Sequence, residues 1–489
     1  MNRIKNLLLV LLISLLCSNL FAKGDSYIYD YWGDIEKSPD TYRVANVLFA
    51  HDLNLGSSLK NPSGFFCIND SVYLVDTDNN RILELTFTKD KKLVYKRTID
   101  KINTPEGIVD TFLGPKDIFV DASGFIYVAD TNNGRVVKVD SNLNLVLQFL
   151  EPDDPTYKKG KSFLPEKVVA DSKGRVYILA KNVNRGFIKY EYDGTFSGFY
   201  GAGDVVVNWT DYVWKMFSTK AQRAQLESFV PTEYSNVYID NEGFLFSVTK
   251  TFEEWALHSG EAKPIRRLNA LGDDILITNA EYLPIGDVDW GNAGGIKGPA
   301  HFSDITVLDN EVYVAVDETR GRIFGYDSQG YLLYAFGGRG NINGFFTSPA
   351  AIEHIGRDLF VLDSMNASIT VLSPTEYGDL IYDATELYAR GEYDQSADVW
   401  KQVLGYNGNY DLAYIGLGKS YIRQEKYKEA MELFKLKRDR RDYSKAFKYY
   451  RQEWLEKNIY WLIAVVLALI LIPFIIKQIK KFKKELMSL

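Results

Sequence analysis

The feature that most constrains the fold of this chain is the alternation of short apolar runs and turn-forming residues between Gly114 and Phe149. This segment, GPKDIFVDASGFIYVADTNNGRVVKVDSNLNLVLQF, contains four apolar runs separated by sets rich in aspartate, asparagine and glycine. Such residues favour turns because they accept a positive φ or hydrogen-bond to their own backbone. Four runs in so short a segment predict a four-stranded antiparallel meander.

The chain contains six copies of this unit, which align on an aromatic residue of the second strand. The aligned aromatic residues are Tyr73, Tyr127, Tyr177, Phe246, Tyr313 and Phe360. One meander cannot bury both of its faces, whereas several meanders packed radially close into a propeller that exposes only short strand edges. We therefore predict an all-β six-bladed propeller over residues 42–373.

The second copy carries the pattern D-x-x-G-x-(I/V)-Y-(V/I)-x-D-T-x-N-x-R-(I/V) almost complete, and Asp76–Arg81 of the first copy matches its second half. This pattern resembles the NHL repeat, and the resemblance covers roughly residues 44–372. The third and fourth copies depart from the pattern at Lys181 and Thr249. Those two blades are therefore predicted from the rhythm of their strands.

Two further predictions concern the course of the chain around the propeller. The segment Tyr42–Phe49 has the pattern of a strand, whereas the sixth copy ends after three strands at Leu372. We expect the early strand to complete the last blade, because this closes the ring and removes two exposed edges. Residues 207–229 have apolar residues at helical spacing and predict a helical insertion, which would be either a cap on the propeller or a partner-docking helix.

Two hydrophobic segments indicate a membrane-bound chain. Residues 1–22 have Arg3 and Lys5 ahead of an apolar run, which is typical of a secretory signal peptide. Residues 459–476 are about 18 residues without a charge, enough for one transmembrane helix. The lysine-rich tail, residues 477–489, is expected in the cytoplasm, which places the rest of the mature chain outside it.

Between the propeller and this span, residues 374–457 change from strand to helical periodicity. Tyr393 and Trp400 recur as Tyr427 and Phe434, at a repeat of about 34 residues. The spacing and pattern resemble the tetratricopeptide (TPR) repeat, a helical hairpin that implies a concave surface for partners, followed here by a capping helix. The candidate partner-binding residues of this groove are Tyr382, Tyr388, Tyr410 and Tyr414.

The innermost strand of each blade begins at the central channel of a propeller, so polar residues at those positions are candidates for a binding site. The polar candidates at this channel mouth are Asp117, Glu166, Lys167, Asn236 and Asp304. Lactonases that resemble this architecture bind calcium with carboxylates and amides, because hard cations take oxygen ligands. This resemblance implies an alternative function, a calcium-dependent lactonase-like or lyase-like hydrolase. Lys167 would oppose a divalent cation, so we expect no cofactor and either a ligand-binding mouth or a solvated channel.

The sequence favours binding over catalysis. It contains no nucleophile elbow with a triad, no P-loop and no dinucleotide fingerprint, and its four histidines share no register that suits zinc. The net charge of −7 provides no basic field for nucleic acid. We therefore expect a membrane-anchored extracytoplasmic scaffold that binds a protein partner in a membrane complex. Its arrangement is similar to that of bacterial membrane proteins with NHL and TPR repeats, some encoded beside sugar-uptake transporters, which implies such a transporter as the neighbour.

Overall fold

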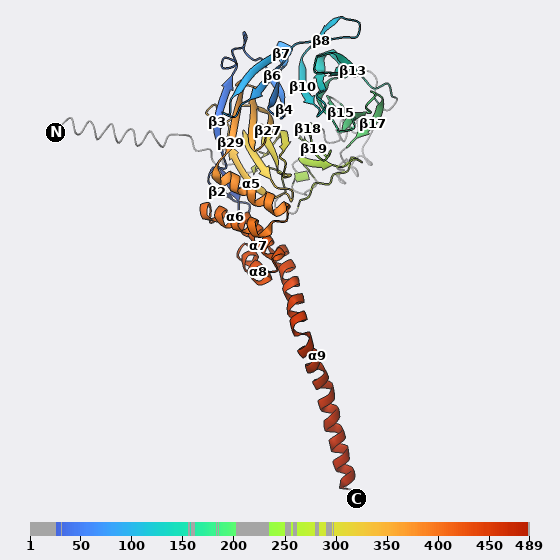
Figure 1. Ribbon diagram of the computed structural model, residues 1–489, viewed down its shortest axis with the longest axis vertical. Coiled ribbons are helices and arrows are strands. Elements are labelled where there is room, and N and C mark those ends of the chain that lie inside the picture. Colours follow the sequence, from blue (N-terminus) through green and yellow to red (C-terminus); the bar gives the residue numbers. More distant parts are fainter. Residues whose placement is uncertain are drawn as a thin grey trace, which may run out of the picture. The chain divides into compact units, whose positions relative to one another are not determined.

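The computed structural model describes residues 26–30, 32–154, 157, 162–181, 183, 185–201, 234–249, 256–257, 262–278, 283–289, 296 and 298–487. These residues form two compact units that divide after Asp379. The first unit consists of β-sheets and the second of helices (Figure 1). The signal peptide predicted for residues 1–22 and the helix predicted for residues 207–229 lie outside the described residues.

The first unit is a propeller of six antiparallel blades. Blade 1 consists of β4 (Pro62–Ile68), β5 (Ser71–Asp76), β6 (Arg81–Phe87) and β7 (Leu93–Ile99). Blade 2 consists of β10 (Pro115–Val120), β11 (Ile126–Asp130), β12 (Arg135–Val139) and β13 (Leu145–Phe149). Blade 3 consists of β14 (Pro165–Ala170), β15 (Val176–Ala180), β16 (Phe187–Tyr190) and β17 (Phe196–Tyr200).

The second half of the ring is less regular than the first. In its described residues, blade 4 consists of β18 (Tyr234–Ile239), β19 (Leu245–Thr249) and β20 (Ile265–Leu268). Blade 5 contains β23 (Phe302–Val307), β24 (Tyr313–Asp317), β25 (Arg322–Tyr326) and β26 (Leu332–Gly337). Blade 6 contains β27 (Pro349–Ile355), β28 (Asp358–Asp363), β29 (Ser368–Pro374) and β3 (Tyr42–Phe49).

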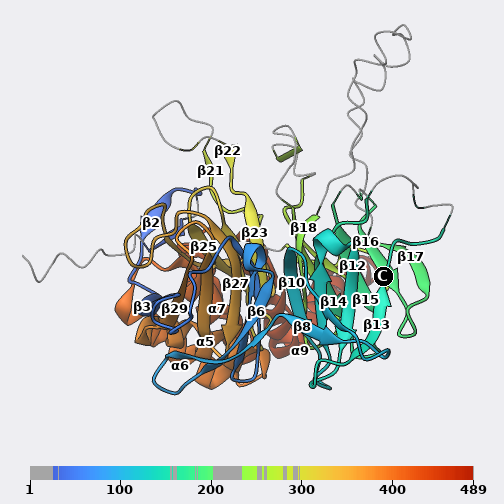
Figure 2. The same ribbon diagram turned by 90° about the horizontal axis from the view of Figure 1, so that it is seen from above.

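The first strands of the six blades form the inner ring, and Figure 2 shows β10, β18, β23 and β27 in the middle of the view, between β3 on one side and β17 on the other. Each of β4, β10, β14, β18, β23 and β27 contacts the next, and β27 contacts β4. β3 pairs with β29 from Ser368 opposite Phe49 to Pro374 opposite Tyr42, which confirms the predicted completion of the last blade. Tyr42 is buried and stacks on Phe336 of blade 5 at a centroid distance of 5.2 Å.

Several short hairpins were not predicted. β1 (Tyr27–Tyr29) adds to the outer edge of β26, and β2 (Ile35–Lys37) pairs with β1, so blade 5 becomes a six-stranded sheet. Two more hairpins are β8 (Lys101–Asn103) with β9 (Val109–Thr111), and β21 (Val288–Asp289) with β22 (Gly298–Pro299). Strands of two or three residues are too short to show a period of two in the sequence.

The hydrogen bonds of the aspartate that ends the second strand explain why the repeat motif contains D-T-x-N-x-R. In blade 2, Asp130 is fully buried, and its Oδ1 accepts the backbone N–H of Leu113 at 2.8 Å. Its Oδ2 accepts hydrogen bonds from Asn133 Nδ2 and Arg135 Nε, each at 2.8 Å. The D-T-x-N-x-R pattern is therefore a clasp that ties the segment leading into β10 to the β11–β12 turn.

The second unit contains the helices that follow the propeller. They are α5 (Glu376–Ala389), which crosses the division between the units, α6 (Tyr393–Tyr406), α7 (Asp411–Arg423), α8 (Tyr427–Leu436) and α9 (Arg440–Leu486). α6 packs on α7, α7 on α8 and α8 on α9. Trp400 lies against Gly416, where a Cβ would come within 2.4 Å of the indole ring, so the glycine makes room for this contact.

α9 is a single helix of 47 residues. It is the one helix in the described part of the chain that is long and apolar enough to span a membrane. Most of its large apolar side chains between Ile459 and Ile476 are exposed, for example Leu469 at 69% and Ile470 at 63%. The helical region is therefore confirmed as containing one long apolar helix.

Removal of β3 tests ring closure. We compare the full-length chain in detergent with versions whose mature sequence begins at residue 41, which removes β1 and β2, or at residue 50, which also removes β3. The version that begins at residue 50 is expected to melt about 10 °C or more below the version that begins at residue 41, since roughly 2–4 °C is lost for each kcal/mol of stability in a domain of this size. Equal melting temperatures in the two shortened versions would show that β3 is not required for closure.

Candidate functional site

Four of the five residues predicted at the channel mouth occupy equivalent places in the inner ring. Each first strand carries a bulge near its start, and one residue of each strand follows the bulge in the same register. These residues are Gly64, Asp117, Lys167, Asn236, Asp304 and Ala351. The aligned copies thus share one register at the start of their inner strands.

The central side chains connect neighbouring blades. Lys167 Nζ of blade 3 lies 3.2 Å from Asp117 Oδ1 of blade 2, and Asp117 Oδ2 accepts the Val168 N–H at 2.9 Å. Asp304 repeats this arrangement between blades 5 and 6, because its Oδ2 accepts the Ile352 N–H at 2.8 Å. Asn236 Nδ2 of blade 4 donates to Asp304 Oδ1 at 2.5 Å.

Glu166 does not join these four residues. It lies at the bulge of β14, one position before Lys167, and its Oε1 forms an ion pair with Lys116 Nζ at 2.6 Å. Both side chains of this pair are partly exposed. The structure brings together Asp117, Lys167, Asn236 and Asp304, and it adds Glu353 of β27, which the sequence did not identify.

The central cluster is buried, and burial controls its charge. Removal from water raises the pKa of Asp117, raises that of Asp304 to about 7 and raises that of Glu353 well above its ordinary value. Lys167 is the cation that opposes these shifts. The cavity among these side chains is only about 20 Å³, which is room for about one water molecule.

The donor set at the centre does not fit calcium. Calcium needs about six to eight oxygen ligands, whereas the oxygens of Asp117 and Asp304 already accept hydrogen bonds from Lys167, Asn236 and backbone N–H groups. Among the described residues, no group of three or more His, Cys, Asp or Glu side chains is arranged to hold a metal ion. The geometry of these carboxylates instead fits a role in joining the blades.

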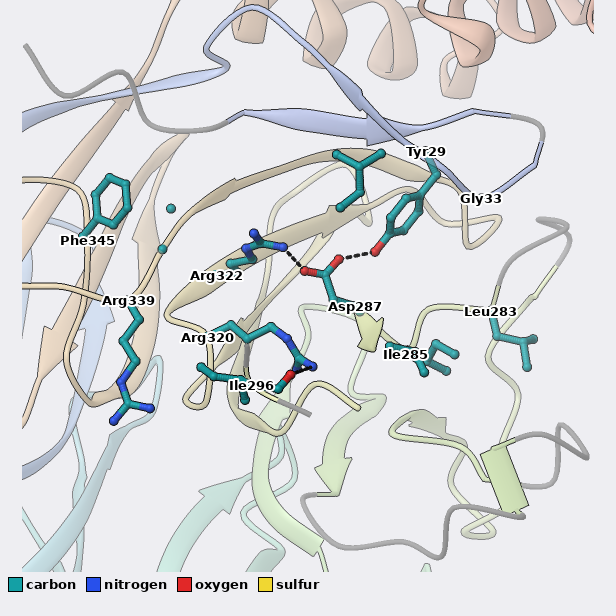
Figure 3. Close-up of a pocket in the computed structure, with 15 residues that line it drawn as sticks. Tyr29, Gly33, Leu283, Ile285, Asp287, Ile296, Arg320, Arg322, Arg339 and Phe345 are labelled. Carbon is teal, nitrogen blue, oxygen red and sulfur yellow. Dashed lines mark hydrogen bonds and ion pairs between the residues drawn. The ribbon is translucent and has the colours of Figure 1, made fainter. Parts of the chain in front are cut away.

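A larger cavity lies at the side of blade 5, with a volume of about 740 Å³ (Figure 3). Its walls come from the β1–β2 hairpin, the ends of β25 and β26, and the segment before β21. Its apolar side chains include Ile35, Leu283, Ile285, Ile296 and Phe345. Its polar side chains are Tyr29, Asp287, Arg320, Arg322 and Arg339.

Asp287 holds this pocket together. Its Oδ1 accepts hydrogen bonds from the Tyr27 hydroxyl at 2.8 Å and the Tyr29 hydroxyl at 2.5 Å, and its Oδ2 pairs with Arg322. Burial and the neighbouring Asp287 carboxylate raise the pKa of both tyrosines, so their hydroxyl groups stay protonated and act as donors. Arg320 is also engaged, since it donates to the Ile296, Gly298 and Pro299 carbonyl oxygens and pairs with Asp317.

Sequence reasoning did not find this pocket. Its residues come from a short hairpin ahead of the propeller and from a segment outside the repeats, so no shared register joins them. Two signals were present in the sequence. One was the pair Tyr27 and Tyr29 on alternate positions, and the other was Arg320, an additional arginine in the blade 5 copy of the motif.

The predicted groove tyrosines of the helical unit differ in exposure. Tyr382 and Tyr410 are 0% and 1% exposed, so the prediction that they line an accessible groove is wrong, because both belong to the core. Tyr388 is half-buried, and its ring lies 5.4 Å from that of Tyr393. Tyr414 is also half-buried, with Lys437 Nζ 4.6 Å above its ring.

From the raised pKa values of the central carboxyl groups, we predict that stability falls as the pH rises through neutrality. The folded-state pKa of Asp304 is about 7, above its unfolded value, so the folded state holds the extra proton and stability is lost as pH rises toward and through 7. His354, whose pKa burial lowers to about 4, acts in the opposite direction only below its ordinary pKa of about 6.5. Between about pH 6.5 and 8 the change in the free energy of unfolding therefore comes mainly from the carboxyl groups. We expect this free energy to fall by about 1 kcal/mol over this range.

This prediction is tested by measuring the melting temperature of the full-length chain in detergent at about pH 6.5 and about pH 8. The melting temperature is expected to be lower at pH 8, and Asp304→Asn is expected to reduce the difference. Asp140→Asn, in an exposed turn of blade 2, is the control and should leave the difference unchanged. A difference that Asp304→Asn does not alter would contradict the assignment to Asp304.

Comparison with known proteins finds one repeat family and one curated relative. The NHL repeat model matches residues 112–139. The chloroplast protein SUPPRESSOR OF QUENCHING 1 from Arabidopsis thaliana is 30% identical over 167 residues, which are 32% of this chain and 14% of that protein. The chain therefore corresponds to only a small part of that relative.

Two solved structures of low sequence identity resemble the chain. Virginiamycin B lyase from Staphylococcus aureus is 13% identical with a TM-score of 0.41, over 68% of this chain and 99% of the lyase. A gluconolactonase candidate is 12% identical with a TM-score of 0.38, over 72% of this chain and 98% of that protein. From its own coordinates and the repeat match, this chain carries an NHL repeat within a six-bladed β-propeller.

Proposed function

We propose that this protein is a membrane-anchored binding protein that presents its propeller and helical unit outside the cytoplasm and engages a protein partner. The observation that carries this proposal is α9, which continues without interruption from its contact with α8 into an uncharged stretch. Apolar surface in water costs about 25 cal/mol for each Å², so a row of exposed leucine and isoleucine side chains favours a bilayer. The helix would then hold the rest of the chain at a membrane surface.

The proposed orientation rests on charge. Lysines 477, 480, 481, 483 and 484 follow the apolar stretch directly, and such clusters remain on the cytoplasmic side. A signal peptide at residues 1–22 would send the following chain across the membrane. With one later span, the propeller and residues 374–457 would lie outside the cytoplasm and the C-terminus inside it.

The helical unit is the proposed partner-binding part. Its helix lengths and the 34-residue recurrence of Trp400 as Phe434 support TPR-like hairpins, α5 with α6 and α7 with α8, capped by the start of α9. Trp400 of α6 lies against Gly416 and Phe434 of α8 lies against Gly418, so both recurring aromatic residues pack against a glycine of α7. Stacked hairpins of this kind present a surface to partners.

Two half-buried tyrosines mark the proposed contact surface. Tyr388 hydrogen-bonds to Arg423 and thereby raises the pKa of that arginine, and Tyr414 lies under Lys437. Tyrosine and arginine are among the residue types that contribute most to protein interfaces. A partner in the same membrane, such as a sugar-uptake transporter, would meet this surface at a high effective concentration.

The hydrolase alternative receives less support from the geometry. Its catalytic centre would have to use the central carboxylates, whereas Asp117 and Asp304 form hydrogen bonds between blades and enclose about 20 Å³. A binding function places no such demand on these side chains.

The proposed orientation predicts the labelling of single cysteines by a membrane-impermeant maleimide. In a background with Cys17→Ser and Cys67→Ser, Ser488→Cys should react only after the cells are lysed. Tyr192→Cys, at a position that is 71% exposed on the propeller, is the matched control and should react in spheroplasts before lysis. Labelling of Ser488→Cys in intact spheroplasts would reverse the proposed topology.

The proposed partner surface predicts the effect of tyrosine substitutions on complex formation. After cross-linking in membranes and solubilisation in detergent, Tyr388→Ala with Tyr414→Ala should reduce partner recovery by about tenfold or more, as expected for loss of interface residues worth about 1–2 kcal/mol each. Tyr192→Ala, an exposed tyrosine of the propeller, is the matched control and should leave recovery unchanged. Equal recovery from the double variant and the control would place the partner site elsewhere.

A further inference from the structure

The pocket beside blade 5 contains one arginine that the rest of its wall does not neutralise. Arg320 pairs with Asp317, and Arg322 pairs with Asp287. Arg339 is exposed and forms no hydrogen bond or ion pair with the described part of the chain. The described walls of the pocket therefore leave one positive charge available to a ligand.

The surroundings of Arg339 give the pocket two chemically different ends. Figure 3 shows Leu283 and Ile285 at one end, and Arg339 with Phe345 at the other. The ring of Phe345 lies against Gly338, where a Cβ would come within 2.4 Å of the ring, and Arg339 pairs with Phe346 in a parallel bridge. The backbone on both sides of the arginine is thus fixed by contacts of its own.

The opposite wall is held just as firmly. Asp287 joins three separate segments, because it binds Tyr27 and Tyr29 of β1 and Arg322 of β25. These buried, charge-assisted hydrogen bonds fix the β1–β2 hairpin and Ile35 beside blade 5. The pocket is consequently preformed, which lowers the free-energy cost of ordering its walls when a ligand binds.

We propose that this pocket binds a small organic monoanion, a carboxylate with an aliphatic or aromatic body. Its charged group would pair with Arg339, whose planar guanidinium suits a carboxylate, and its body would lie against Ile285, Ile296 and Phe345. A volume of about 740 Å³ lies in the range of small-molecule sites, about 300–1,000 Å³. This site goes beyond the proposed function, because it concerns a small molecule on the propeller and not a protein on the helical unit.

The charge of the ligand is the sharpest test of this proposal. The probes are 4-phenylbutyrate, its neutral amide and 4-phenylbutylamine, which share one apolar body and differ in charge. Binding to the full-length chain in nanodiscs is measured by calorimetry, with empty nanodiscs as the reference. The carboxylate should bind about tenfold more tightly than the amide, as expected for one charged hydrogen-bonded pair.

Substitution at Arg339 then separates this site from non-specific binding. Arg339→Gln should remove the preference for the carboxylate, and Arg339→Glu should reverse it in favour of the amine. Arg43→Gln removes the same charge from an exposed position on β3 outside the pocket, so it should retain the wild-type preference. Because Arg339 is exposed, all three variants should keep the wild-type melting temperature.

Two results would overturn the proposal. One is the absence of a carboxylate preference in the wild-type chain, or of any saturable binding by a panel of aryl and alkyl carboxylates at millimolar concentration. The other is a preference that persists in Arg339→Gln as strongly as in Arg43→Gln, since this would assign the charge effect to another part of the chain or to the nanodisc.

Discussion

The propeller depends on buried carboxylates that accept backbone N–H groups. Apolar packing between blades is not directional and does not by itself fix the angle between adjacent sheets. Asp117 bonds to the Val168 N–H, and Asp304 to the Ile352 N–H, so a side chain of one blade fixes the first strand of the next. Such bonds offset part of the cost of burying a carboxylate, because they are charge-assisted and lie where water cannot compete, although burial still raises the pKa of both groups.

The central side chains leave a cavity of only about 20 Å³, whereas the pocket of about 740 Å³ lies at the side of blade 5. In blade 2 the motif arginine, Arg135, pairs with the aspartate of its own clasp, Asp130. In blade 5 an additional arginine, Arg320, pairs with the clasp aspartate, and Arg322 is released to bind Asp287. The arginine pair of the blade 5 copy therefore leaves Arg322 as an anchor for the N-terminal hairpin, which forms one wall of the pocket of about 740 Å³.

Those parts of the fold that repeat could be predicted from the sequence, and those that do not repeat could not. Six copies of one pattern predicted the blades and the need for Tyr42–Phe49 to close the ring, whereas the bulge near the start of each inner strand was not predicted. The strand β1 lies outside the repeats and has only three residues, and it is ordered by its contacts with β2, β26 and Asp287. No shared pattern could therefore point to the pocket that this strand completes.

Errors at single residues have a common cause, which is that sequence spacing does not determine the direction of a side chain. Glu166 and Lys167 are neighbours at a bulge, and only Lys167 joins the central cluster. Tyrosine is common in binding surfaces, but it also occurs in cores when its hydroxyl group has a hydrogen-bond partner. Tyr382 and Tyr410 are both buried in the core. The proposed partner surface accordingly rests on Tyr388 and Tyr414, because both are partly exposed in the structure.

The continuity of α9 gives the proposed anchoring a mechanical consequence. About 19 residues of this helix precede Ile459, and at about 1.5 Å for each residue they span roughly 28 Å. A flexible linker would let the helical unit sample a wide range of heights, whereas a helix that is packed on α8 at its start and anchored as proposed would hold that unit at a fixed distance from the bilayer. Under this arrangement, the partner surface would be within reach of proteins that project roughly 28 Å from the same membrane.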